Sequence, residues 1–163
     1  MADPRLVADI QRAEGCPTDP VSHLPVAYRD SEGNWTIGWG HLLDQSIDWA
    51  GHVITWETAR TLLSSDLDAR RAECERLPEW PSLDTECRQN AVVECVFNLG
   101  LKHWTDEFPH TREAIRKQLW TQAATDLLDS PEWIKQVGRA RVARLAGYLR
   151  SGSYSPPSAS GPA

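Results

Sequence analysis

The first half of the chain has helically spaced apolar residues at its two ends and strand-like segments between them. The Asp-Pro pair at 3–4 is typical of a helix N-terminus, and apolar residues recur every three or four positions from there until Gly15. We therefore expect a short first helix that ends at Glu14. Segments 26–30 and 35–39 are short, aromatic and β-branched and enclose a polar turn, which predicts a β-hairpin.

Helical spacing dominates the second half. Thr55 is suited to cap a long helix over residues 55–77, and a second apolar stripe runs from Asp84 to Gly100. Three shorter helical patterns follow over residues 111–120, 122–128 and 139–149. From Ser151 onward the chain is Ser, Gly and Pro with almost no apolar residues, so we expect it to be only weakly tethered. The pattern predicts an α+β fold that is mainly α.

Length and charge narrow the possibilities. A chain of 163 residues fits one domain, and it contains no internal repeat. Its formal net charge of −6 argues against a general nucleic-acid binder, which needs an excess of Lys and Arg. No apolar segment follows the N-terminal Met-Ala-Asp-Pro-Arg, and none elsewhere approaches the ~18 residues of a membrane span. We therefore expect neither an export signal nor membrane insertion.

The four cysteines do not indicate a metal centre. They form no Cys-x-x-Cys pair and lack the His spacing of a zinc site, so we expect no metal. Cys87 and Cys95 would lie about 12 Å apart along one helix, which is beyond the reach of a disulfide. Buried reduced thiols are favoured, and Cys74 with Cys87 is the one bridge that stays open.

Most of the candidate chemistry lies in one part of the chain. Glu14-Gly15 comes first, and the strings Ala27-Tyr28-Arg29-Asp30 and Gly33-Asn34-Trp35-Thr36-Ile37-Gly38-Trp39-Gly40-His41 follow. These strings closely resemble the phage-type lysozymes, the endolysins of glycoside hydrolase family 24. Segments 90–100 and 138–154 are similar to that family's central and last helices, so the resemblance runs from about Leu6 to Tyr154.

The resemblance implies a lysozyme-like fold with two lobes. It places a small N-terminal lobe with the hairpin sheet at about 1–54 and a connecting helix at about 55–77. A helical C-terminal lobe follows at about 78–154, and a flexible tail at 155–163. Residues 1–154 are thus expected to form a single lysozyme-like domain.

The resemblance also implies that Glu14, Asp30 and Thr36 form the catalytic group. Fifteen residues separate Glu14 from Asp30, more than is usual in the family, so we expect a longer loop that contains Asp19. Of the two aspartates, only Asp30 keeps the spacing to Thr36 that the family shows. Hydrolysis with inversion needs one acid that protonates the leaving oxygen. It also needs a carboxylate that activates a water molecule on the opposite face of the sugar ring. Glu14 suits the acid, because the negative pole at a helix C-terminus disfavours its anion. Asp30 in a polar turn suits the base, with the Thr36 hydroxyl fixing the water.

Further residues are candidates for substrate binding by resemblance. They are His41, Leu42, Phe97, Asn98, Trp133, Gln136 and Arg139. For His41 the alternative is a pairing with Asp66 that ties the hairpin to the long helix. For Phe97 and Trp133 the alternative is core packing. Segment 131–150 carries five basic residues against one Glu, which suits an anionic wall polymer, although an exposed helix with solvated arginines has the same composition.

These residues lead us to expect cleavage of the β-1,4 bond between N-acetylmuramic acid and N-acetylglucosamine in bacterial peptidoglycan. The reaction would invert the anomeric carbon and use neither metal nor organic cofactor. The alternatives are a lytic transglycosylase and a non-catalytic wall-binding or virion structural module. We expect a monomer that stays in the host cytoplasm until a holin allows its release to the periplasm or cell wall, or else one that travels in the virion.

Overall fold

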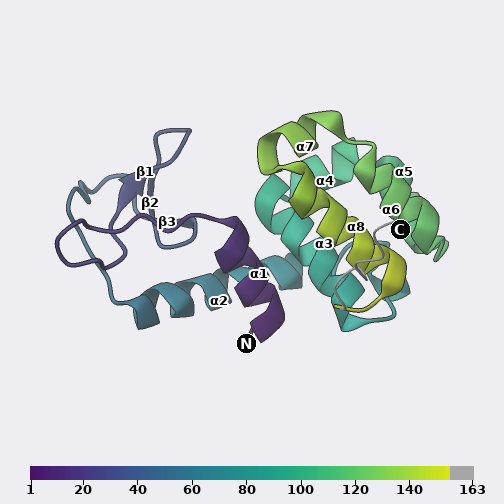
Figure 1. The fold of residues 1–163 in the computed structure, drawn as a ribbon, viewed down its shortest axis with the longest axis horizontal. Coiled ribbons are helices and arrows are strands. Elements are labelled where there is room, and N and C mark those ends of the chain that lie inside the picture. The colour runs from purple at the N-terminus through teal and green to yellow at the C-terminus, as the bar shows by residue number, and fades with distance from the viewer. Residues whose placement is uncertain (155–163) are drawn as a thin grey trace, which may run out of the picture. The chain divides into compact units, whose positions relative to one another are not determined.

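The computed structural model describes residues 1–154, which form two compact units. The first unit is residues 1–69 and the second begins at Arg70, so the boundary falls within one long helix. The described residues are mainly helical with one small antiparallel sheet (Figure 1), which confirms the predicted α+β class. No described helix is long and apolar enough to cross a membrane. The flexible tail expected at 155–163 lies outside the described residues.

The first unit opens with helix α1 (Pro4–Ala13), which begins where the sequence predicts and ends one residue before the expected Glu14. The Asp3 carboxylate accepts a hydrogen bond of 2.6 Å from the Arg5 main-chain N–H and so caps the first turn. Leu6 and Ile10 are buried on one face. Glu14 is the C-terminal cap, in an extended conformation, and its main-chain N–H still donates to the Ile10 carbonyl at 2.8 Å.

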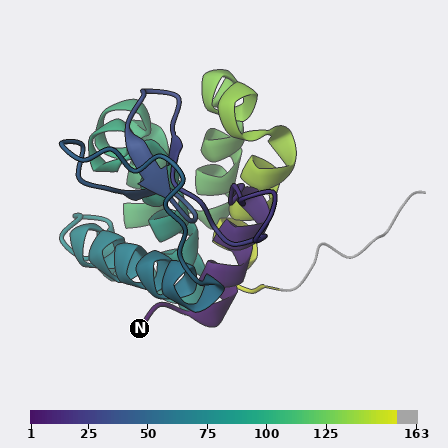
Figure 2. The ribbon, with the colours of Figure 1, turned by 90° about the vertical axis from the view of Figure 1, so that its left-hand side faces the viewer.

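A three-stranded antiparallel sheet follows in the order β1-β2-β3. Its strands are β1 (Tyr28–Arg29), β2 (Trp35–Ile37) and β3 (His41–Leu42). The predicted hairpin is thus confirmed, with shorter strands, and β3 is an addition to it. Both views place the strands on one side of the N-terminal half of helix α2 (Figures 1 and 2). Gly38, with a φ of +64°, stands between β2 and β3, and a Cβ there would lie 3.6 Å from Ala59 of that helix.

Helix α2 (Trp56–Cys74) begins as expected after Thr55, whose hydroxyl accepts a hydrogen bond of 3.1 Å from the Thr58 main-chain N–H. In the first unit its buried face consists of Ala59, Leu63 and Leu67. The helix stops three residues before the expected end at Leu77, because the Leu77 N–H bonds to the Cys74 carbonyl in a tighter turn.

The second unit is built around α3 (Glu86–Leu99), which is buried from Ala91 to Val96. It starts two residues later than the expected Asp84, since Thr85 is its N-cap, and Gly100 ends it with a φ of 81°. The remaining helices are η1 (Trp80–Ser82, a 3₁₀ turn), α4 (Leu101–Glu107), α5 (Pro109–Arg116), α6 (Trp120–Leu128), α7 (Pro131–Val137) and α8 (Arg139–Ser151). Helix α8 packs against both α3 and α6.

Two helices of this unit are missing from the sequence prediction. Helices α4 and α7 have seven residues each, too few for an apolar period to show, and Pro131 is the first residue of α7 rather than part of a turn. The single helix expected over 111–120 is wrong in a different way. Gln118 has a φ of +55°, which separates the end of α5 from the start of α6 at Trp120.

The cysteines are free thiols, and Cys74, Cys87 and Cys95 are buried, as the sequence favoured. Burial raises the pKa of Cys74 to about 12, so this thiol stays protonated. The bridge between Cys74 and Cys87, left open by the sequence, is therefore not formed.

The chain is better tethered after Ser151 than its composition predicts. Ser151 completes α8, and the ring of Tyr154 packs edge-on against Tyr148 at 5.1 Å. The Tyr154 hydroxyl also accepts a hydrogen bond from the Asn90 side chain. An aromatic residue after a Gly-containing exit can fold back onto a helix, which composition alone does not reveal.

Candidate active site

The turn between β1 and β2 holds Asp30 by several hydrogen bonds. The main-chain N–H groups of Glu32 and Asn34 donate to Asp30 Oδ1 at 2.9 and 2.8 Å, and the Asn34 side chain donates to Oδ2 at 3.3 Å. These donors, the Asn34 N–H first among them, hold the pKa of Asp30 below its ordinary value of 3.8. Asp30 is therefore an anion throughout the weakly acidic and neutral range.

Thr36 lies in β2, two residues after Asn34, and is only 2% exposed. Its hydroxyl donates a hydrogen bond of 3.2 Å to the Asn34 carbonyl, so its oxygen lone pairs are left to accept from another group. Asn34 thereby contacts both Asp30 and Thr36. Sequence reasoning missed Asn34, because both of these main-chain contacts depend on the turn geometry and not on its side chain.

Tyr28 is affected electrostatically both by this turn and by the residue that caps α1. It is the cross-strand partner of Thr36, which puts their side chains on the same face of the sheet. Burial raises the pKa of Tyr28 above its ordinary value. Negative charge on Cys16, Glu14 and Asp30 raises it further. Glu14 and Asp30 thus both lie near enough to act electrostatically on one hydroxyl, although fifteen residues separate them in sequence.

The segment between Glu14 and Asp30 is an ordered loop. Thr18 and Pro25 form an isolated β-bridge across it. At its tip the Asp19 carboxylate accepts hydrogen bonds from the Ser22 main chain and side chain, at 2.7 and 2.8 Å, which lower the pKa of Asp19. Both carboxylates therefore close their own turns, but only Asp30 shares a hydrogen-bonding partner, Asn34, with Thr36.

His41 in β3 contacts Asp66 in α2, as predicted. The His41 Nδ1 atom lies 3.0 Å from both carboxylate oxygens, and each side chain is about 30% exposed. This contact ties the sheet to the helix within the first unit. The next residue, Leu42, projects into solvent with 61% exposure. A role for either residue in binding substrate stays a prediction.

The candidates in the second unit differ in how much surface they offer. Trp133 is only 3% exposed, donates a hydrogen bond of 2.9 Å to Asn98 Oδ1 and meets the Phe108 ring edge-on at 5.6 Å. This is the packing alternative named above for Trp133. Phe97 is half-buried, and Gln136 and Arg139 are exposed. Their contact with a substrate is untested.

The basic segment of α8 has a partner that sequence reasoning missed. Glu94 of α3 is 1% exposed and accepts hydrogen bonds from Arg141 at 3.0 Å and from Arg144 at 2.7 Å. Two of the five basic residues therefore bind a buried carboxylate, and neither is simply a solvated arginine. The signal was a single Glu within the apolar run from Ala91 to Val96, which faces the core on every side.

Among the described residues, no group of three or more His, Cys, Asp or Glu side chains is arranged to hold a metal ion.

A family described as phage lysozyme matches residues 12–150. The chain belongs to the phage lysozyme family. The matched segment contains all three residues of the predicted catalytic group of a phage lysozyme, Glu14, Asp30 and Thr36. A protein named endolysin, from Acyrthosiphon pisum secondary endosymbiont phage 1, is 33% identical over 79 residues, which are 48% of this chain and 51% of that endolysin. The chain thus spans about half the length of this curated relative.

Proposed function

We propose that this member of the phage lysozyme family is an endolysin that hydrolyses the β-1,4 bond between N-acetylmuramic acid and N-acetylglucosamine with inversion. One observation carries the proposal. A single turn holds the Asp30 carboxylate as an anion and, through Asn34, fixes the Thr36 hydroxyl beside it. The electrostatic effect of Glu14 and Asp30 on Tyr28 supports placing the second acid nearby.

Each residue of the proposed group has one task. Glu14 donates its proton to the glycosidic oxygen as the bond to the anomeric carbon breaks. Asp30 removes a proton from a water molecule whose oxygen forms the new bond on the opposite face of the sugar. The Thr36 hydroxyl, whose own proton points to the Asn34 carbonyl, accepts the second hydrogen of that water. One proton is donated and one is taken up, so the net reaction is hydrolysis.

The test is clearing of a suspension of purified sacculi by wild type, Glu14→Gln and Asp30→Asn. Each substitution is expected to lower the rate by about 100-fold or more, since general acid–base groups contribute ~10²–10⁴-fold. Glu57→Gln, an exposed residue in the first turn of α2, is the matched control and should clear like wild type. NMR of the first product should show the inverted anomer, and the retained anomer would contradict the roles given to Asp30 and Thr36.

The same assays separate the alternatives. Products that lack the mass of one water would identify a lytic transglycosylase, which makes an anhydro sugar. No clearing by wild type would indicate a non-catalytic wall-binding or structural module, whereas equal clearing by wild type and Glu14→Gln would contradict the acid role of Glu14.

We further propose that the protein acts as a monomer without cofactor, with α2 connecting lobes at about 1–54 and 78–154. The proposed substrate contacts are His41, Leu42, Phe97, Asn98, Trp133, Gln136 and Arg139. Light scattering after size-exclusion chromatography tests the oligomeric state, and KM values of alanine variants test the contacts. Fractionation of infected cells, with and without an active holin, distinguishes release at lysis from carriage in the virion.

A further inference from the structure

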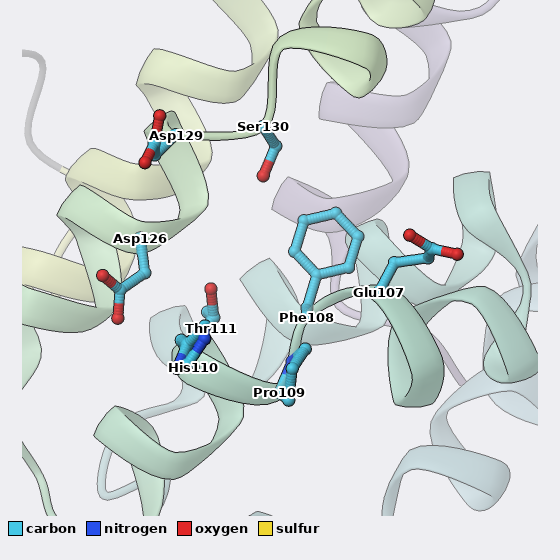
Figure 3. A pocket seen from close by; sticks show the side chains of 8 residues that line it. All are labelled: Glu107, Phe108, Pro109, His110, Thr111, Asp126, Asp129 and Ser130. Atoms are coloured by element: carbon cyan, nitrogen blue, oxygen red, sulfur yellow. The ribbon is translucent and has the colours of Figure 1, made fainter.

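Polar side chains outside the proposed catalytic group lie in both units. In the second unit, a shallow pocket between α4, α5 and α6 is lined by carboxylates such as those of Glu107 and Asp129 (Figure 3). Both of these side chains are exposed, and an acidic cluster at a surface defines no ligand by itself. Tyr28 of the first unit is the stronger candidate for a further role, because strand pairing and loop closure place it among the proposed catalytic residues.

Tyr28 shares one face of the sheet with Asp30 and Thr36. It is the cross-strand partner of Thr36, and cross-strand partners project to the same side. Asp30 comes two residues later, and its main-chain N–H continues the strand pairing by donating to the Asn34 carbonyl at 3.0 Å. Since side chains alternate along a strand, Asp30 leaves the chain on the same side as Tyr28. The Tyr28 side chain therefore starts from the face that carries the proposed water-activating pair.

The opposite face of the sheet supplies a hydrophobic core for the first unit. Trp35 and Ile37, the neighbours of Thr36 in β2, are buried with Ala27 in one cluster. Tyr28 projects to the other side and is partly exposed. Packing in that cluster therefore does not account for an aromatic residue at position 28.

The loop that follows Glu14 turns the chain back toward this acid. Its two arms pair with each other, since the Val26 main-chain N–H donates to the Pro17 carbonyl at 3.1 Å and the adjoining residues form an isolated β-bridge. From this hydrogen bond the chain runs three residues back to Glu14 and two residues on to Tyr28. Tyr28 is thus near Glu14 as well, although fourteen residues of the loop stand between them in the printed order, from Gly15 onward, minus those that follow the closure.

The Tyr28 hydroxyl is a neutral hydrogen-bond donor. Burial raises its pKa above the ordinary value of 10.0, and the charges of Cys16, Glu14 and Asp30 raise the pKa further, so the proton stays on the oxygen in the neutral range. In the described part of the chain no hydrogen bond of this hydroxyl is found. Because the side chain is partly exposed, its O–H can donate to a ligand.

The chemistry of the proposed reaction selects the acceptor on the sugar. The glycosidic oxygen takes the proton of Glu14, and the ring oxygen becomes electron-poor in the oxocarbenium-like transition state, so neither favours a second donor. The nearest remaining acceptor is the carbonyl of the acetamido group, which is attached to the carbon beside the anomeric one. An amide oxygen has two lone pairs and accepts readily from a hydroxyl. A donor on the face of Asp30 and Thr36 therefore suits this carbonyl.

We propose that Tyr28 donates a hydrogen bond to the acetamido carbonyl of the N-acetylmuramic acid at whose anomeric carbon water attacks. The proposal rests on the proposed function for its choice of substrate. Tyr28 would hold the acetamido oxygen away from the anomeric carbon, which this oxygen attacks in glycosidases that use substrate assistance. The contact thus favours attack by the water that Asp30 and Thr36 orient. It also makes the protein prefer N-acetylated glycan strands to de-N-acetylated ones.

Binding can be measured without turnover by NMR titration of the full chain. The probes are GlcNAc–MurNAc, which lacks the bond proposed to be cut, and the same disaccharide with the muramic amine free. Wild type should bind the acetylated probe about fivefold more tightly than Tyr28→Phe does, the factor expected of one neutral hydrogen bond. Both proteins should bind the free-amine probe equally. Tyr148→Phe removes a phenol hydroxyl from the second unit and is the matched control, expected to bind each probe like wild type.

The ζ-carbon NMR signal of isotope-labelled tyrosine reports hydrogen bonding at the phenol. The Tyr28 signal is assigned by exclusion with Tyr148→Phe and Tyr154→Phe, so this measurement needs no substitution at position 28. In wild type it should shift with the acetylated probe and stay with the free-amine probe. Clearing of sacculi by Tyr28→Phe should be about fivefold slower by the same factor at each pH from 5 to 8, because the donor keeps its proton throughout.

Each outcome bears on the proposal. An equal loss of affinity for both probes in Tyr28→Phe would show a packing role and overturn the contact. An unmoved Tyr28 signal, or no binding of the acetylated probe up to millimolar concentration, would overturn it too. Clearing of sacculi at the same rate by wild type and Tyr28→Phe overturns the Tyr28 contact alone. An acetamido preference that depends on Tyr28, in a wild-type chain that clears nothing, overturns the proposed activity alone.

Discussion

The main-chain N–H of Asn34 donates a hydrogen bond of 2.8 Å to the carboxylate of Asp30. The Asn34 carbonyl accepts a hydrogen bond from the Thr36 hydroxyl. The main-chain groups of Asn34 therefore orient both Asp30 and Thr36, the proposed water-activating pair. Three of the four hydrogen bonds described above for Asp30 and Thr36 involve main-chain groups of Glu32 or Asn34. The positions of Asp30 and Thr36 should therefore depend little on the side chains of neighbouring residues, whereas activity should depend strongly on the Asp30 and Thr36 side chains themselves.

The pH dependence of stability should report the state of Asp30. Its pKa is lower in the folded protein, so its stabilising contribution is complete above about pH 4 and is lost as the pH falls through the folded value. Urea unfolding between pH 2 and 6 should therefore show a steeper loss of stability in wild type than in Asp30→Asn. Parallel curves for the two proteins would contradict this, as would a carboxyl titration of Asp30 by NMR at or above 3.8.

The Thr36 hydroxyl should matter far more to activity than to stability. Thr36→Val keeps the shape and loses the oxygen, so we expect clearing of sacculi to fall by about 100-fold, while unfolding free energy falls by only ~1 kcal/mol for one neutral hydrogen bond. Thr36→Ser keeps the hydroxyl and is the matched control, expected within about tenfold of wild type. Equal losses in the two variants would show that packing in β2, and not the hydroxyl, is what activity needs.

Sequence predicts the parts of this fold that local residues determine. The limits of α1 follow from Asp3 and from the chain leaving the helix at Glu14, and the start of α2 follows from Thr55. Strand β3 has only two residues, and its pairing depends on β2. A two-residue strand has no period to detect.

Only part of the candidate site can likewise be predicted from the sequence. Asp30 and Thr36 are visible as residue types at a characteristic spacing, and Glu14 as the residue at the end of the first predicted helix. Tyr28 and Asn34 are not, because they act through a cross-strand pairing and through main-chain groups that exist only once the turn has formed. The pairing of Glu94 is the hardest to predict, because its partner Arg141 lies forty-seven residues away in the sequence.

A double-mutant cycle should give His41 and Asp66 a small coupling energy. Both side chains are about 30% exposed, so solvent screens the pair, and we expect about 0.5–1 kcal/mol in chemical denaturation of His41→Ala, Asp66→Ala and the double variant. The more exposed pair Lys102 and Asp106 is the matched control and should give less. A coupling near zero would mean that β3 is held to α2 by packing alone.

Substitution of the buried carboxylate of Glu94 should lower the stability of the protein far more than substitution of an exposed carboxylate in the same unit. Glu94→Gln keeps the volume but leaves Arg141 and Arg144 facing a neutral group in the core, and removing one partner of a buried ion pair costs ~3–5 kcal/mol. Glu113→Gln is the matched control, because this carboxylate also binds two cations, yet is 45% exposed. Its substitution should cost much less, because solvent screens an exposed ion pair. Urea unfolding of the two variants measures the contrast directly. Equal losses would mean that water reaches Glu94 and screens its charge, in which case the two arginines are available to a ligand after all.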